Sequence, residues 1–132
     1  MRSRIVRGEG RRWPGVPVSC YKQDAASFCE VNRRTLLGRE AGDELSFEVR
    51  YFEVLPGGWT TFEHHEHPHA VIVMAGRGEA RLGGERHPIA PFDVVYVAPG
   101  EAHQFRAADD ERLGILCVVD AERDRPVPLD EG

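Results

Sequence analysis

Short apolar, β-branched runs alternate with glycine- and proline-containing turns along most of the chain, and this pattern predicts a protein built from strands. Glycine and proline recur every 8 to 12 residues, which is typical of an all-β sandwich or barrel. No segment of ten or more residues shows a clear 3.6-residue apolar period, so no long helix is expected. The expected strands are 45–55, 59–65, 71–74, 79–82, 85–89, 93–97, 103–107 and 113–119, with weaker support for 27–37.

Turn residues indicate where these strands should stop. The Pro-Gly-Gly at 56–58 is expected to end one long strand, and the Gly-Gly at 83–84 is expected to close a hairpin. The Glu-His-Pro at 66–68 can turn the chain, so that His69 enters the site from the next strand.

The two ends of the chain differ from its middle. Residues 1–12 hold five arginines and two glycines, and they predict a flexible basic N-terminal arm. Residues 120–132 mix seven charges with two prolines, which favours an irregular C-terminal tail. The remaining segment, 13–119, is long enough for one domain and too short for two, so a single β-barrel domain is expected there.

Composition narrows the classes of function. With 17 basic and 22 acidic side chains, the net charge of −5 argues against binding nucleic acid through a broad basic face. No apolar run approaches the ~20 residues that cross a bilayer, and the basic N-terminus lacks the apolar segment of a secretory signal. Three cysteines without a CxxC pair predict reduced thiols and a cytoplasmic protein.

Histidine is the unusual residue, because four of the six histidines lie within 64–69. Glu63 and His65 are two apart on an expected strand and therefore share a face, whereas the adjacent His64 points to the other face. His69 and the later His103 bring two further imidazoles. Imidazole and carboxylate are accepted ligands of divalent transition metals, so this spacing favours a metal site over a solvated histidine-rich loop.

The stretch 56–76 resembles the first motif of the cupin superfamily. In that motif a glycine precedes an HxH pair, a Glu follows, and a second glycine comes seven residues after the Glu. Counting back from Gly76 places His69 at the family's Glu position, and Glu63 and His65 at the HxH positions. The family's first histidine and its glutamate are thus exchanged in this chain.

The stretch 92–103 resembles the second cupin motif, whose single histidine would be His103. Two features of that motif differ here. Phe92 replaces the usual glycine, and Ala107 stands where an asparagine often follows.

The resemblance implies an all-β cupin jelly-roll barrel of two antiparallel sheets, holding one divalent transition metal per chain (Fe, Mn, Ni, Zn or Cu). The implied metal ligands are Glu63, His65, His69 and His103. The residues expected to line the pocket or support the ligands are His67, Phe105, Ile115 and Cys117. Small cupins usually pair, so the resemblance also implies a homodimer.

The metal site and the resemblance are compatible with two kinds of function. The first is a metal-dependent enzyme of oxygenase, isomerase or lyase type acting on a small organic substrate, and the fold does not choose among these reactions. The second is a non-enzymatic module that binds or senses a small ligand or a metal. Four further side chains are candidates to orient an anionic substrate, and strand parity leaves open which of them face the barrel: Arg50, Tyr51, Tyr96 and Arg106.

Overall fold

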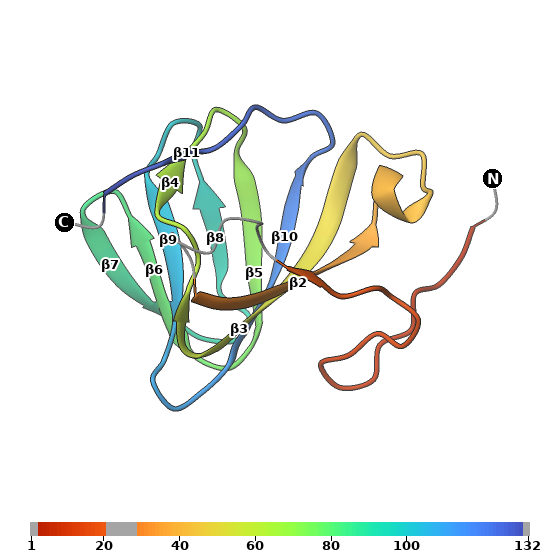
Figure 1. Ribbon diagram of the computed structural model, residues 1–132, viewed down its shortest axis with the longest axis horizontal. Coiled ribbons are helices and arrows are strands. Elements are labelled where there is room, and N and C mark those ends of the chain that lie inside the picture. Colours follow the sequence, from red (N-terminus) through yellow and green to blue (C-terminus); the bar gives the residue numbers. More distant parts are fainter. Residues whose placement is uncertain (1–2, 21–28, 131–132) are drawn as a thin grey trace.

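The computed structural model describes residues 3–20 and 29–130, and its strands form one continuous antiparallel sheet, which curls so that its two parts face each other as two sheets joined through β3 (Figure 1). One sheet has the order β2-β3-β10-β5-β8, and the other has the order β7-β6-β9-β4-β11. The strands are β1 Ser19–Cys20, β2 Cys29–Leu37, β3 Phe47–Trp59, β4 Glu63–His64, β5 His69–Ala75, β6 Gly78–Leu82, β7 Glu85–Ile89, β8 Val94–Val97, β9 His103–Ala107, β10 Leu113–Asp120 and β11 Val127–Pro128. A 3-10 helix, Arg39–Ala41, follows β2. The predicted all-β barrel is confirmed.

The long strand β3 joins the two sheets, and the prediction that it ends at 56–58 is wrong. β3 pairs with β10 as far as Val54 and then with β9 at Trp59. Gly57 takes a positive φ of 73° and donates its N–H to the carbonyl of Ala108, so the chain bends without leaving the sheet. The Pro-Gly-Gly at 56–58 therefore bends β3 at a corner of the barrel and does not end the strand.

The predicted strand 59–65 is also wrong, since only Glu63–His64 (β4) pairs as a strand. Between β3 and β4, Thr60 replaces regular pairing with its own bonds to Phe105. Its N–H donates to the Phe105 carbonyl at 2.8 Å, and its hydroxyl accepts the Phe105 N–H at 2.9 Å. β4 is thereby brought beside the start of β9, where Glu63 is paired with His103.

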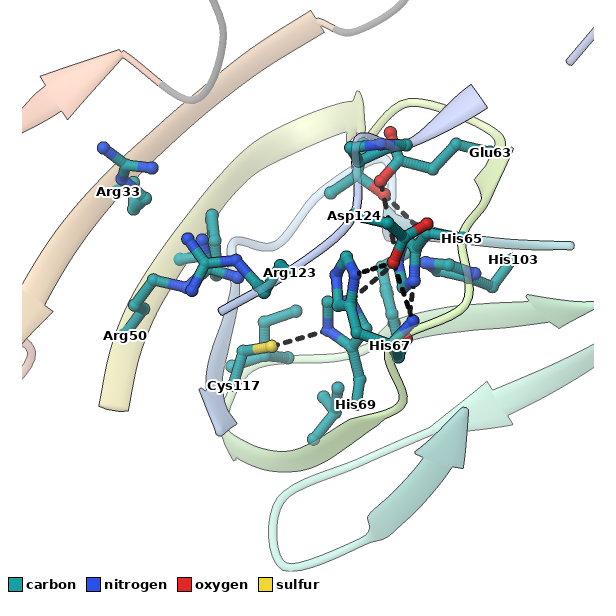
Figure 2. Close-up of a pocket in the computed structure, with 16 residues that line it drawn as sticks. Arg33, Arg50, Glu63, His65, His67, His69, His103, Cys117, Arg123 and Asp124 are labelled. Carbon is teal, nitrogen blue, oxygen red and sulfur yellow. Dashed lines mark hydrogen bonds and ion pairs between the residues drawn. The ribbon is translucent and has the colours of Figure 1, made fainter. Parts of the chain in front are cut away.

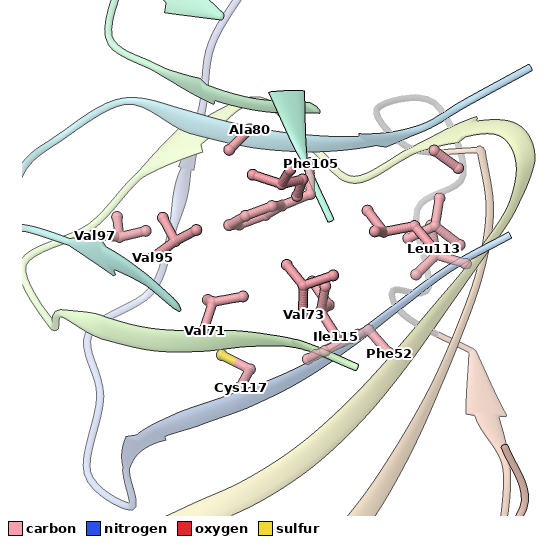
Figure 3. Close-up of a cluster of buried hydrophobic side chains, with 14 of the residues drawn as sticks. Phe52, Val71, Val73, Ala80, Val95, Val97, Phe105, Leu113, Ile115 and Cys117 are labelled. Carbon is pink, nitrogen blue, oxygen red and sulfur yellow. The ribbon is translucent and has the colours of Figure 1, made fainter. Parts of the chain in front are cut away.

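The apolar core lies between the two sheets. Figure 3 shows Phe105 and Ala80, from β9 and β6, facing Val71 and Ile115, from β5 and β10. From β5, Val71 and Val73 are buried in this core, whereas Met74 on the same strand is exposed. The hairpin predicted at 83–84 is confirmed, with β6 and β7 paired on either side.

Both ends of the described chain contact the barrel. The guanidinium of Arg4 pairs with the Asp43 carboxylate at 2.6 Å, and β11 pairs with β4. No helix in the described residues is long and apolar enough to cross a membrane. Cys117 is a free, buried thiol. The expected start of a strand at 27–28 and the side chains of Cys20 and Cys29 lie outside the described residues.

Candidate metal centre

Four predicted ligands meet at one end of the barrel core. Glu63 lies on β4, His65 directly follows that strand, and the turn at 66–68 lets His69 open β5 as predicted. His103 opens β9, opposite Glu63. All four line one pocket of about 200 Å³, which is ample for a small organic molecule because one water needs only about 10–15 Å³.

Three imidazoles form the centre of this site. Their ligand nitrogens lie within 4.8 Å of one another on His65, His69 and His103. The Nε2 atoms of His65 and His69 are 2.8 Å apart. Two nitrogens that bind one metal at about 2.1 Å, at right angles, would be about 3.0 Å apart. The observed spacing therefore fits a pair of ligands on one ion.

Backbone carbonyls fix the orientation of two of these rings. The Nδ1–H of His65 donates to the His67 carbonyl at 2.6 Å, and that of His103 donates to the Glu101 carbonyl at 2.9 Å. A carbonyl only accepts hydrogen bonds, so the proton of each neutral ring sits on Nδ1 and the lone pair on Nε2. Both lone pairs thus remain available for a metal.

His69 is held by a different partner. Its Nδ1 lies 2.7 Å from the Sγ of Cys117, on the side of the ring away from the His65 contact (Figure 2). A thiol donates or accepts weakly, so this contact tolerates the ring proton on either nitrogen. The sequence placed Cys117 in the pocket wall, but nothing in the sequence indicated its contact with His69.

Glu63 and His64 lie on opposite faces of β4, as strand parity predicts. Glu63 is 5% exposed, and its Oε2 lies 3.9 Å from the Nε2 of His65. Glu63 lies beside the three imidazoles, but it is not one of the residues whose ligand atoms all lie within 4.8 Å of one another. His64 does not line the pocket.

Burial keeps the central imidazoles neutral. Burial first, and then the neighbouring His103 and His67, lower the pKa of His65 to about 4. Burial first, and then His103 and His65, lower the pKa of His69 to about 2. Neutral rings are the form that binds a metal, so the site is prepared for a cation at neutral pH.

An aspartate from the C-terminal segment fastens the turn between the ligands. Asp124 accepts hydrogen bonds from the Glu66 N–H at 2.8 Å, the His67 N–H at 2.9 Å and the His67 Nδ1 at 2.7 Å. These bonds, that of Glu66 first, hold the pKa of Asp124 well below its usual range. Asp124 was missed because a charged tail carries no motif that points back to a site 57 residues earlier.

A second group of ligand atoms, on His65, His67 and Asp124, is also close enough to hold an ion. The rings of His65 and His67 are stacked 3.6 Å apart and nearly parallel, at 3°. Stacked rings present faces to each other, and the Nδ1 of His67 is engaged by Asp124. This group therefore fits a hydrogen-bonded support for the turn better than a metal site.

Comparison with known proteins identifies the family. The family model described as Cupin domain matches residues 50–119, which include both motifs and all four predicted ligands. The chain belongs to the cupin family. The core side chains Phe105, Ile115 and Cys117 of this cupin also line its pocket, so the apolar core continues into the pocket wall.

Several known cupins and cupin-like proteins are similar to this one over most of its length. The 1-methylthio-D-xylulose 5-phosphate methylsulfurylase of Rhodospirillum rubrum is 47% identical over 116 residues, or 87% of this chain and 72% of that protein. A solved cupin-2 domain from Rhodospirillum rubrum is 44% identical, with a TM-score of 0.84 over 98% of this chain and 86% of that one. A cupin 2 conserved barrel domain protein from Rhodopseudomonas palustris is 42% identical, with a TM-score of 0.86 over 98% and 88%.

Proposed function

We propose that this cupin is a metal-dependent enzyme that acts on a small phosphorylated sugar carrying a methylthio group. The observation that supports the metal dependence is a group of three imidazoles in one pocket whose ligand nitrogens lie within 4.8 Å of one another. The substrate class is supported by the 47% identity to a protein named for 1-methylthio-D-xylulose 5-phosphate.

We assign the metal ligands to His65, His69 and His103, with Glu63 as the adjacent oxygen donor, for one divalent ion per chain. Three nitrogens and one carboxylate suit Fe, Mn, Ni, Zn or Cu, and this donor set alone does not choose among them. Such an ion supplies Lewis acidity to a substrate oxygen. In a ketose with a methylthio group at the neighbouring carbon, that oxygen is the carbonyl beside the carbon–sulfur bond.

The chain's own residues position the substrate and exclude water. Part of the pocket wall is apolar, formed by Phe52, Phe105 and Ile115, so a bound sugar would displace solvent from its reacting end. The contacts of His67 and Asp124 hold the turn that carries His65. Ligands on strands and on a pinned turn give the site the rigidity that positioning requires.

The test is reconstitution of the metal-free protein with each of the five metals, followed by incubation with 1-methylthio-D-xylulose 5-phosphate. We expect the NMR signal of the S-methyl group to shift as the substrate is consumed, with one or more metals and not with chelator. His69→Ala should abolish the reaction, and His64→Ala should retain it. Tight binding of the sugar phosphate without turnover on any metal would instead identify a non-enzymatic binding module.

We further propose that the cupin forms a homodimer. Four large apolar side chains on or next to the β5–β8 edge are exposed, as expected of a face that is covered in an assembly: Met74, Phe92, Val94 and Tyr96. Sedimentation under reducing conditions should show a dimer at micromolar concentration. Val94→Lys with Tyr96→Glu should give monomers, and a monomeric wild type would contradict the proposal.

A further inference from the structure

Three arginines from distant parts of the chain line the same pocket. Arg33 lies on β2, Arg50 on β3, and Arg123 on the segment that follows β10. Figure 2 shows Arg33 and Arg50 across the pocket from Glu63 and His103. The pocket thus has a guanidinium end and an imidazole end.

Arg50 is the buried member of this group, at 8% exposed. In the described part of the chain its Nε has no hydrogen-bond partner and its guanidinium has no carboxylate in ion-pair contact. Its neighbours are the ring of Phe52, 5.1 Å from the guanidinium carbon, and the side chain of Cys117. A buried cation without an anion is costly, so Arg50 indicates a site for one.

The carboxylates near the other two arginines balance only part of the charge. Glu48 bonds Arg123 at 3.0 Å, whereas the exposed Glu40 lies 3.9 Å from Arg33. The Nε of Arg33 is also buried without a partner among the described residues. Burial, with the charges of Arg123 and Arg33, lowers the pKa of Arg50. The two unpartnered Nε atoms, together with the burial of Arg50, therefore indicate a place for an anion at the guanidinium end.

We propose that Arg50, with Arg33 and Arg123 at the rim, binds the phosphoryl group of the substrate. This inference rests on the proposed function and adds an orientation, with the phosphoryl group at the arginines and the carbonyl end at the histidines. Guanidinium groups pair with phosphate oxygens in a bidentate manner. Cys117 touches His69 and adjoins Arg50, so one small molecule in this pocket can reach both ends.

Phosphate binding can be measured without a metal and without turnover. The metal-free protein is titrated calorimetrically with inorganic phosphate, D-xylulose 5-phosphate and D-xylulose, at constant ionic strength in chloride. We expect both phosphates to bind and D-xylulose to bind far more weakly. Arg50→Gln should weaken phosphate binding by about 10- to 150-fold, as the loss of a charged hydrogen bond predicts, and Arg33→Gln should weaken it less.

Arg106→Gln is the matched control. Arg106 also has a buried Nε without a partner among the described residues, but it stacks on Trp59 and lies outside the pocket. Phosphate affinity in this variant should equal that of the wild type. Equal weakening in Arg106→Gln and Arg50→Gln, no phosphate binding by the wild type, or acetate binding as tight as phosphate would each overturn the assignment.

The same variants separate this inference from the proposed function. If phosphate binds through Arg50 but the methylthio sugar phosphate is not consumed on any metal, the reaction is wrong and the subsite stands. If the wild type consumes the substrate and Arg50→Gln does so with an unchanged KM, the reaction stands and the subsite is wrong.

Discussion

The thiol of Cys117 lies 2.7 Å from the Nδ1 of His69, whose Nε2 faces the Nε2 of His65 at 2.8 Å. In the neutral metal-free site the bare Nε2 of His65 needs a donor, so His69 holds its proton on Nε2 and accepts the thiol proton on Nδ1. If His69 held a metal through Nε2, its ring proton would stand on Nδ1, where the sulfur of Cys117 could accept it. Cys117 supports both states and is therefore a positioning residue for His69.

Replacing Cys117 should test this role through metal affinity. Cys117→Ala removes the partner of Nδ1, and we expect the affinity for Mn(II) or Zn(II) to fall by about 10–100-fold, the usual effect of losing such a support. Cys117→Ser keeps a donor and acceptor and should recover most of the affinity. Competition with a chelating dye measures both. Ile115→Val, on the same strand and pocket wall, is the control and should bind as the wild type does.

The ligand assignment predicts a graded set of metal contents. His65→Ala, His69→Ala and His103→Ala should each lose stoichiometric metal, and His64→Ala should keep it. Glu63→Ala should retain metal weakly, because three imidazoles remain within 4.8 Å of one another. Elemental analysis of untagged protein after gel filtration gives the metal per chain. Full occupancy in His69→Ala would show that another residue takes that ligand position.

The glycine that sets the motif register explains why the histidine cluster could be located from sequence. Gly76 has a positive φ of 76°, and a Cβ there would overlap the carbonyl oxygen of Arg112. Such a position strongly favours glycine, which fits Gly76 as the glycine of the motif that the chain resembles, and the spacing of that motif leads from it to His69. Strand parity then separated Glu63 and His65 from His64. Strand parity and the resemblance to the cupin motif together led to this part of the site.

The guanidinium end of the pocket and the support of the turn could not be located in the same way. Arg50 was one of four candidates for an anionic substrate, and parity did not tell which faces the pocket. The structure places Arg50 there and leaves Tyr51 in the core, Tyr96 at the surface and Arg106 on Trp59. Arg33, Arg123 and Asp124 reach the pocket only because distant segments fold against it. Their positions in the sequence therefore show no motif or regular spacing that would link them to the histidines.

Asp124 should support metal binding from outside the ligand set. Asp124→Asn keeps the shape of the side chain but loses the charge that strengthens its three bonds to Glu66 and His67. We expect a loosened turn and a metal affinity reduced by up to about 100-fold, less than in His65→Ala. Asp130→Asn, on the same exposed segment, should leave the affinity unchanged. An affinity in Asp124→Asn equal to that of the wild type would show that the turn holds without this residue.

The lowered pKa values of His65 and His69 predict how acid affects the metal-free protein. In the unfolded chain both imidazoles titrate near their ordinary pKa of about 6.5. In the folded protein, burial and neighbouring histidines lower these pKa values to about 4 and about 2. Between about pH 6.5 and pH 4 the unfolded chain therefore binds more protons, so the free energy of unfolding should fall as the pH falls and level off above about 6.5.

Urea unfolding followed by circular dichroism, after removal of metal, measures this slope at several pH values. The double variant His65→Gln, His69→Gln lacks both groups and should lose less stability than the wild type across the same range. His64→Gln removes a histidine outside the pocket and should keep the wild-type slope. Asp124 does not interfere, because its lowered pKa affects stability only below its ordinary value of 3.8. Parallel pH profiles for the wild type and the double variant would mean that these two imidazoles are not held neutral by the fold.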